Sequence, residues 1–310
     1  MTSLDRPGAL ATIGRTPIVR ARGLEEAGSA EVWVKVESHN PTGSYKDRMA
    51  LAMIEGAERS GRLERGRTVV EYTGGSTGSS LALVCAVKGY PLRIVSSDAY
   101  AEEKIRTMRA FGAEVELIAS PRGITPTLVG EMRARARELA AEIGGYETDQ
   151  FNNTDMVEGY RAMGDEIVEQ LDGRVDAFVT YVGTAGCYCG VTRALRRHLP
   201  AVHRVAVEPA ESPVLGGGTP GIHRIEGGGV GFWPPQLGRD EIDEIVAVST
   251  AHAFEMARTA SRAIGLWSGP STGANFVAAV QVARRLGSGA RVVTPLVDSG
   301  LKYLGSDLYR

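Results

Sequence analysis

The strongest constraint on the fold is an alternation, along the whole chain, of short β-rich runs with helical stretches. Such alternation indicates a mostly parallel sheet that is flanked by helices, which is the α/β class of fold. Helices are predicted at 46–62 and 102–111, where apolar residues recur on one face. Strands are predicted at 32–36, 69–71, 92–95, 115–117, 178–182, 204–207 and 292–296.

Two loops of small residues each connect a predicted strand to a predicted helix. They are residues 73–78, which read TGGSTG, and residues 183–187, which read GTAGC. Glycines let the backbone approach a ligand, and the free N–H groups at the start of a helix attract negative charge. The loops are therefore candidates for binding a phosphate and a carboxylate, although many such loops are only tight connections. Neither loop matches a P-loop or a dinucleotide-binding motif.

Lys46 follows a turn-forming run, residues 40–45, and is placed in the first turn of a predicted helix. A cation is disfavoured there by the helix dipole, so the neutral amine is favoured. The neutral amine is the form that attacks an aldehyde. A solvated surface lysine is the alternative, because most lysine side chains are exposed. Together with the two loops, Lys46 favours a phosphorylated aldehyde cofactor.

The composition excludes several other classes of protein. The chain has 310 residues and 43% hydrophobic content, so it can bury one or two cores. A net charge of −2 gives no basic surface for nucleic acid or an anionic membrane. We find no apolar run of about 18 residues, no secretory segment, and no cysteine or histidine spacing typical of a disulfide framework or a metal site. We expect a soluble cytoplasmic protein without a metal.

The chain resembles the fold-type II pyridoxal-phosphate enzymes of the cysteine synthase (O-acetylserine sulfhydrylase) and cystathionine β-synthase family. The likeness rests on residues 13–20, 40–48, 71–78, 111–113, 150–153, 183–190, 207–215, 227–232 and 298–304. It implies a tryptophan synthase β-like fold with two three-layer αβα domains and mostly parallel sheets. Residues 48–148 would form a small mobile domain that grips the substrate, and residues 1–47 with 149–310 a large cofactor-binding domain. A homodimer is also implied.

The resemblance assigns a role to each matching residue. Lys46 would hold pyridoxal 5′-phosphate as an internal aldimine and later move the substrate's α-proton. The other implied cofactor-binding residues are Ser76, Gly183, Thr184, Ala185, Gly186, Cys187 and Ser299. The implied substrate-binding residues are Thr73, Gly74, Gly75, Thr77, Gln150 and Gly228.

Ser299 is expected to face the pyridine nitrogen of the cofactor. A neutral hydroxyl there does not fully protonate the ring, which suits α,β-elimination better than transamination. The chemistry would shift if the neighbouring Asp298 met the nitrogen instead, but we expect Asp298 to be a turn or surface residue.

Five residues depart from the family pattern, and one of them is Val230, where an alanine is frequent. Gly74 and Ser76 stand where a serine and an asparagine are usual, and Ala185 and Cys187 where a glycine and a threonine are usual. Glycine at 74 is expected to enlarge the pocket, and Ser76 to reach the cofactor's 3′-oxygen directly or through a water. Ala185 is tolerable if its φ is negative, and Cys187 is a weaker donor than threonine. We therefore expect weaker cofactor binding and an altered substrate or acceptor.

The implied activity is a β-replacement on an L-serine derivative, O-acetylserine or O-phosphoserine, through an aminoacrylate. Sulfide as the nucleophile would give L-cysteine, and another nucleophile a related β-substituted alanine. One alternative is a β-eliminating lyase that converts cysteine or serine to pyruvate. Another is a catalytically weak relative that only binds an amino acid.

Overall fold

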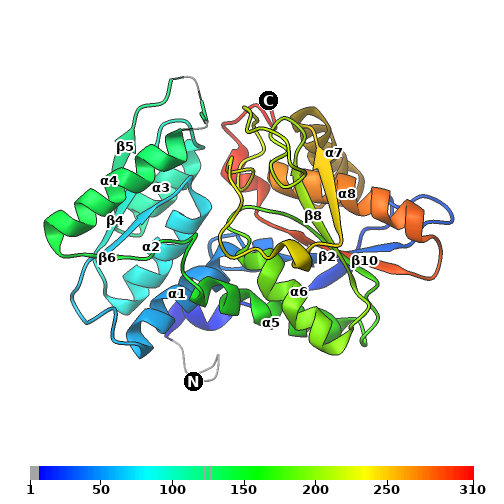
Figure 1. Ribbon diagram of the computed structural model, residues 1–310, viewed down its shortest axis with the longest axis horizontal. Helices are drawn as coiled ribbons and strands as arrows, with labels where there is room; N and C mark the ends of the chain where they lie inside the picture. The colour runs from blue at the N-terminus through cyan, green and yellow to red at the C-terminus, as the bar shows by residue number, and fades with distance from the viewer. Residues whose placement is uncertain (1–6, 122, 126) are drawn as a thin grey trace.

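The computed structural model describes residues 7–121, 123–125 and 127–310, and it contains two separate sheets (Figure 1). The six-stranded sheet has the order β1-β2-β10-β7-β8-β9, and every neighbouring pair in it is parallel except β1 with β2. Its strands are β1 (Ile18–Arg20), β2 (Glu31–Val36), β7 (Ala177–Tyr181), β8 (His203–Pro209), β9 (Glu244–Val248) and β10 (Arg291–Leu296).

The second sheet has four parallel strands in the order β5-β4-β3-β6. Its strands are β3 (Val69–Tyr72), β4 (Leu92–Ser97), β5 (Glu114–Ile118) and β6 (Tyr146–Glu147). The helices of the described residues are α1 (Lys46–Arg59), α2 (Ser76–Lys88), α3 (Glu102–Ala110), α4 (Leu128–Ile143), α5 (Asp155–Gln170), α6 (Gly186–His198), α7 (Thr250–Ile264) and α8 (Pro270–Leu286). The described part of the chain also contains the short 3₁₀ helices η2 (Gly8–Thr12), η3 (Glu37–His39), η4 (Arg239–Glu241) and η5 (Gly300–Tyr303).

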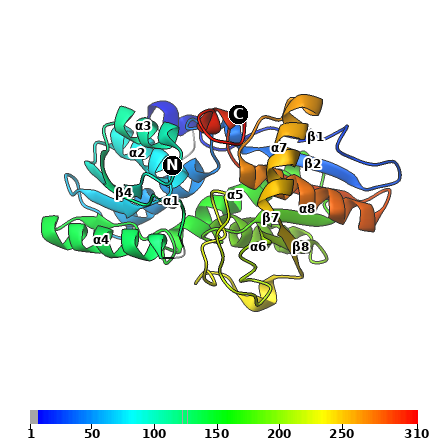
Figure 2. The same cartoon turned by 90° about the horizontal axis from the view of Figure 1, so that it is seen from above.

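Each sheet is covered by helices on both faces, which confirms the predicted pair of three-layer αβα units. In the smaller unit α4 lies on one face of the sheet, and α2 and α3 lie on the other (Figure 2). In the larger unit Phe276 of α8 belongs to the core of one face, and Tyr160 of α5 and Val191 of α6 belong to the core of the other. Strands that are covered on both faces become uniformly apolar, and β7 is buried along its whole length.

The predicted strands and helices are all present, while three strands were not predicted. The strands β1 and β6 have only three and two residues, too few to show a periodic pattern. The helix predicted at 46–62 ends at Arg59, before Gly61 with a φ of +72°. None of the described helices has the length and apolar character that crossing a membrane requires.

The four-stranded sheet is formed entirely within residues 69–147. The helix α1 packs against both α2 and α5, so the predicted domain boundary at residue 48 falls inside a helix that contacts both units. The boundaries at 48 and 148, and the mobility of the smaller unit, stay predictions. Parallel strands place the carboxyl ends of β3 and β7 next to the starts of α2 and α6, and this juxtaposition builds the site.

Candidate active site

A cavity of about 120 Å³ brings together most of the residues that the sequence predicted for the site. The predicted residues that line it are Lys46, Thr73, Gly74, Gly75, Ser76, Thr77, Gln150, Gly183, Thr184 and Gly228. Ala185, Gly186, Cys187 and Ser299 are not among the lining residues. The sequence therefore located the cavity, but it did not distinguish the residues on its surface from those behind it.

Lys46 is the first residue of α1 and its side chain is almost fully buried. Its Nζ forms no hydrogen bond with any described residue and lies 4.9 Å from the centroid of the Tyr45 ring. Burial lowers the pKa of Lys46 to about 8, although nearby acidic groups act in the opposite direction. The neutral fraction of the amine is therefore larger than for an exposed lysine, as the sequence predicted, and the largest cause is desolvation by burial.

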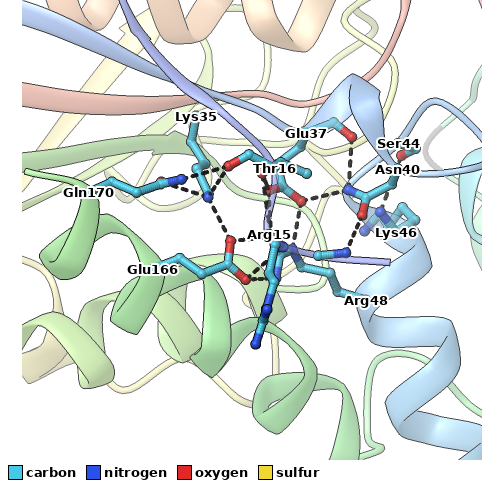
Figure 3. A network of polar contacts seen from close by, with 11 residues as sticks. Arg15, Thr16, Lys35, Glu37, Asn40, Ser44, Lys46, Arg48, Glu166 and Gln170 are labelled. Atoms are coloured by element: carbon cyan, nitrogen blue, oxygen red, sulfur yellow. Dashed lines mark hydrogen bonds and ion pairs between the residues drawn. The ribbon is translucent and has the colours of Figure 1, made fainter. Parts of the chain in front are cut away.

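A buried network of charges holds the start of α1 in place (Figure 3). Arg48 donates to both carboxylate oxygens of Glu37, at 2.8 and 2.9 Å, and of Glu166, at 2.7 and 2.8 Å. Lys35 forms a 2.6 Å ion pair with Glu166. Burial alone would raise the pKa of Glu166, but Arg48 and Lys35 lower it to about 2. The network ties α1 to β2, η3 and α5, and so fixes the backbone that carries Lys46.

The loop after β3 is held to the segment that follows β6 by side-chain hydrogen bonds. Thr77 Oγ1 donates to Gln150 Oε1 at 2.8 Å, and Gln150 Nε2 donates to the carbonyl of Tyr72 at 2.8 Å. One of the two N–H groups of the Gln150 amide is thus left for a ligand. The turn itself requires glycine at position 75, where φ is +133°.

Glu71 lies beneath this pair and was not assigned a role from the sequence. Its carboxylate accepts from Thr148 Oγ1 at 2.6 Å and from the backbone N–H groups of Tyr72 and Gln150 at 2.8 and 3.1 Å. Burial raises the pKa of Glu71 to about 8, against the effect of these donors. Glu71 therefore fixes the position of Gln150 from below. An acidic residue in the interior of a strand that is otherwise apolar is the signal that could have found it.

The prediction that Gly74 enlarges the pocket is wrong. A Cβ added at Gly74 would lie 2.6 Å from Cε1 of Tyr100, because the Tyr100 ring occupies the space that a side chain would fill. Likewise, a Cβ at Gly75 would lie 2.3 Å from Cδ of Lys104. The two glycines make room for side chains from the segment around the start of α3, and both of these side chains line the cavity.

Ser76 contacts the carboxylate of Asp298, a residue whose predicted location was wrong. Ser76 Oγ donates to Oδ2 of Asp298 at 3.3 Å, and Tyr303 Oη donates to the same oxygen at 2.7 Å. Asp298 was expected at a turn or on the surface, but it is 2% exposed. Asp298 does not line the cavity, and its Oδ1 is a buried atom without a partner among the described residues.

The loop after β7 turns in a conformation that the sequence did not predict. Ala185 has a φ of +68°, so the condition under which alanine was expected to be tolerated, a negative φ, is not met. The left-handed conformation costs a residue with a Cβ about 1–2 kcal/mol, and it occurs where the chain turns from β7 into α6. Gly183 and Thr184 face the cavity, and Ala185, Gly186 and Cys187 are buried behind them. Burial raises the pKa of the Cys187 thiol well above its usual range, which does not suit a nucleophile.

Ser299 does not reach the cavity. Its Oγ accepts a hydrogen bond from the backbone N–H of Leu301 at 3.2 Å and so caps η5. A different serine has a free hydroxyl near the cavity. Ser271, at the start of α8, is buried, and its Oγ has no partner among the described residues. A Cβ added at the cavity-lining Gly227 would lie 3.7 Å from this Oγ. The sequence signal that could have found it is the Gly269–Pro270 pair directly before it, because proline is common at the first position of a helix.

The residues present fit a phosphorylated pyridine aldehyde. Lys46 offers a buried amine for the aldehyde, Ser271 an unpaired hydroxyl for a ring nitrogen, and the start of α6 free N–H groups for a phosphate. Glycine is needed at 183 and 228, because a Cβ at either position would lie 2.4 Å from a backbone carbonyl of the facing segment. The fold and this site thus define an α/β enzyme that uses pyridoxal phosphate.

Comparison with known proteins also identifies a pyridoxal-phosphate enzyme. Residues 9–298 match the family described as pyridoxal-phosphate dependent enzyme. The chain is 41% identical over 299 residues to a cysteine synthase of Staphylococcus aureus, with 96% of this chain and 95% of that protein covered. This protein therefore belongs to the family of pyridoxal-phosphate dependent enzymes, and the predicted cofactor is confirmed.

Two solved structures extend the comparison. O-acetylserine sulfhydrylase isoform 3 from Entamoeba histolytica has a TM-score of 0.91 and 35% identity, with 98% of this chain and 91% of that chain covered. The O-acetylserine dependent cystathionine β-synthase from Helicobacter pylori has a TM-score of 0.90 and 33% identity, with 98% and 99% covered. These similarities confirm the predicted fold type and the predicted resemblance.

Proposed function

We propose that the protein catalyses a β-replacement on an L-serine derivative, O-acetylserine or O-phosphoserine, with sulfide or another nucleophile as the acceptor. The observation that carries this proposal is the buried amine of Lys46, with a pKa lowered to about 8, in one cavity with Thr77 and Gln150. Relatives named cysteine synthase and O-acetylserine sulfhydrylase support the choice of a serine derivative.

Lys46 is proposed to carry the cofactor and to move the proton on the α-carbon. When bound, pyridoxal phosphate supplies an electron sink for the charge that remains after the proton leaves. A neutral amine can accept that proton at Nζ, and burial keeps the amine neutral in a larger fraction of molecules near pH 7 than in water. Because the charge network around Arg48 fixes the start of α1, the amine is held at a constant position.

The loop at the start of α2 is proposed to bind the substrate's carboxylate. Thr73, Gly74, Gly75 and Thr77 lie at the N-terminus of a helix, which favours an anion, and Gln150, whose amide keeps one N–H without a partner among the described residues, lines the same cavity. Gly183 and Thr184, with the N–H groups behind them, are proposed to bind the cofactor's phosphate. Gly228 is proposed to border the side of the leaving group.

Ser271, and not Ser299, is proposed as the partner of the pyridine nitrogen. Its hydroxyl is buried beside the cavity and lacks a partner among the described residues, whereas that of Ser299 caps η5. A neutral hydroxyl leaves the ring nitrogen largely unprotonated, so loss of a β-substituent is favoured over transamination. The proposed chemistry is thus unchanged, although the residue differs from the sequence prediction.

A β-eliminating lyase is the second candidate. A hydrogen sulfide-producing enzyme from Fusobacterium nucleatum has a TM-score of 0.90 and 35% identity to this chain. Replacement and elimination share the loss of the β-substituent, and they differ in whether an acceptor or water completes the reaction. We also propose, from the family resemblance, that residues 48–148 move as a unit and that the protein is a cytoplasmic homodimer.

The test is to load the purified protein with pyridoxal phosphate and to supply O-acetylserine, O-phosphoserine, serine or cysteine, each with and without sulfide. We expect a yellow protein whose colour is bleached by borohydride at Lys46, and release of cysteine from a serine ester with sulfide. Release of pyruvate without an acceptor would support the lyase instead. A colourless protein that does not respond to added pyridoxal phosphate would reject both and support a binding role.

A further inference from the structure

An ion pair stands in the wall of the cavity beside the loop at the start of α2, because a Cβ added at Gly75 would lie 2.3 Å from Cδ of Lys104. Lys104 of α3 and Glu226, in the loop between β8 and β9, both line the cavity and pair at 2.6 Å. Their side chains are 3% and 14% exposed, so the pair is largely removed from solvent. A buried pair of this kind strengthens the electrostatic interactions of any group placed beside it.

The lysine of this pair has two hydrogen-bond partners, whereas one oxygen of the glutamate has none. Lys104 Nζ donates to Glu226 Oε2 and to Tyr303 Oη at 3.0 Å, and it lies 4.3 Å from the centroid of the Tyr303 ring. Glu226 Oε1 has no hydrogen bond with any described residue, and a carboxylate oxygen can accept two. Glu226 Oε1 can therefore accept hydrogen bonds from a molecule in the cavity.

No cation within the described cavity wall competes for this oxygen. His223 donates from Nε2 to the carbonyl of Gly229 at 2.9 Å and accepts at Nδ1 from the backbone N–H of Ile225 at 3.3 Å. Burial lowers the pKa of His223, so the ring stays neutral. Lys46 is committed to the cofactor. Among the described lining residues, Glu226 is the only acidic one, and its free oxygen calls for a cationic donor from the substrate.

The same cavity has an apolar wall. Val129, Met132, Phe151 and Val230 line it, and the Phe151 ring packs against that of Phe232 with centroids 5.1 Å apart. An organic thiol can pack its methylene groups on such an apolar surface. Hydrosulfide has no carbon atoms and gains nothing from it. The combination of an apolar wall with one free carboxylate oxygen fits a short organic chain that ends in an amine.

We propose that Glu226 selects the second substrate and that the preferred acceptor is an organic thiol with a protonated amine. This inference rests on the proposed function. In net terms a thiol RSH and O-acetyl-L-serine give the S-substituted cysteine and acetic acid. The C–S bond forms, the C–O bond to acetate breaks with its electron pair leaving on acetate, and the thiol proton is released. Glu226 accepts hydrogen bonds from the amine while the methylene groups of the thiol pack on the apolar wall.

The test compares two acceptors of matched size, cysteamine and 1-propanethiol, with saturating O-acetylserine and the loaded enzyme. Because the two thiols ionise differently, the measure is the change in the ratio of their kcat/KM values between the parent and Glu226→Gln. A hydrogen bond to a charged group predicts that the ratio falls about tenfold or more, mainly through the KM of cysteamine. The exposed Glu255 provides the matched control, Glu255→Gln, in which the ratio should stay as in the parent.

A second measurement does not depend on turnover or on the folding of a variant. The parent is titrated with S-(2-aminoethyl)-L-cysteine and with S-propyl-L-cysteine, which differ only in a terminal amine against a methyl group. We expect at least about tenfold tighter binding of the amine, from the change in tryptophan fluorescence or in cofactor absorbance.

Equal affinity for the two thioethers, or an unchanged ratio in Glu226→Gln, would overturn the inference. Turnover with sulfide and with neither thiol would also overturn it, while leaving the proposed β-replacement intact. No consumption of O-acetylserine with any of the three acceptors would overturn the proposed function, and the inference with it.

Discussion

The two glycine-rich loops have the same pattern in the sequence but are used differently in the structure. Both connect a parallel strand to a helix, β3 to α2 and β7 to α6. Residues 73–77 all line the cavity, whereas in 183–187 only Gly183 and Thr184 do so. A loop of small residues therefore indicates that the backbone closely approaches other atoms. Whether those atoms belong to a ligand or to the protein depends on what surrounds the loop.

The physical difference lies in what covers each loop. The first loop is overlain by Tyr100 and Lys104, whose side chains occupy the space above Gly74 and Gly75 and end in the cavity. The second loop is backed by α5, because a Cβ added at Gly186 would lie 2.9 Å from Sδ of Met156. The first loop shares its space with side chains that can respond to a ligand, and the second is part of a packed core.

Lys46 lines the same cavity as both loops, and replacing it should have the largest effect on activity. In Lys46→Ala we expect turnover of O-acetylserine to fall by about 10³-fold or more, because the proposed function gives Lys46 both the binding of the cofactor and the transfer of the proton. The circular dichroism spectrum should be unchanged. Lys88→Ala, which breaks an ion pair with Glu58 outside the cavity, is the control. Parent-like turnover in Lys46→Ala would remove the basis for assigning either loop to a ligand.

The next largest effect should come from filling the space at Gly74. Gly74→Ser places an atom against the Tyr100 ring, and overpacking of this kind costs about 1–3 kcal/mol. We expect the KM for the amino-acid substrate to rise by about tenfold, and a second change, Tyr100→Ala, to recover part of the loss. Gly130→Ser, at a helical position with open space around it, should leave KM as it is. A parent-like KM in Gly74→Ser would show that Tyr100 moves aside freely.

The pH dependence of cofactor capture tests the state of the amine between the loops. The pKa of Lys46 is about 8, and only the neutral amine has the lone pair that attacks the aldehyde. The rate at which cofactor-free protein binds pyridoxal phosphate should rise about tenfold per pH unit below 8 and level off above it. The growth of visible absorbance after mixing gives this rate. A rate that keeps rising to pH 10 would mean that Lys46 keeps the pKa of an exposed lysine.

The smallest effect is expected in the second loop. Ala185→Gly removes the left-handed strain of a residue with a Cβ, offset in part by the greater freedom of glycine in the unfolded chain. We expect the cofactor-free protein to gain up to about 1 kcal/mol, which is a rise in Tm of about 2–4 °C. Thermal unfolding followed by circular dichroism measures it. A lower Tm would show that the methyl group of Ala185 contributes packing that outweighs the strain.

Local pattern in the sequence was sufficient for the elements and for the two loops. Strands covered on both faces become continuous apolar runs, and the turn at Gly75 needs a residue without a Cβ, so both leave a signal within a few positions. Pattern also indicated that Lys46 has a favoured neutral amine. The prediction named the helix dipole as the cause, whereas the largest cause of the lowered pKa is burial, which is not visible in the residues next to Lys46.

The sequence by itself determined the fold class, the two loops at the starts of α2 and α6, and the place of Lys46 at the start of α1. Only the tertiary structure decided that Tyr100 fills the space at Gly74, that Asp298 is buried against Ser76, and that Ser271 and not Ser299 lies beside the cavity. The contact between Ser76 and Asp298 joins residues 222 positions apart. Elements form from interactions between near neighbours in the chain, whereas the groups that meet in the site are chosen by how the two units pack.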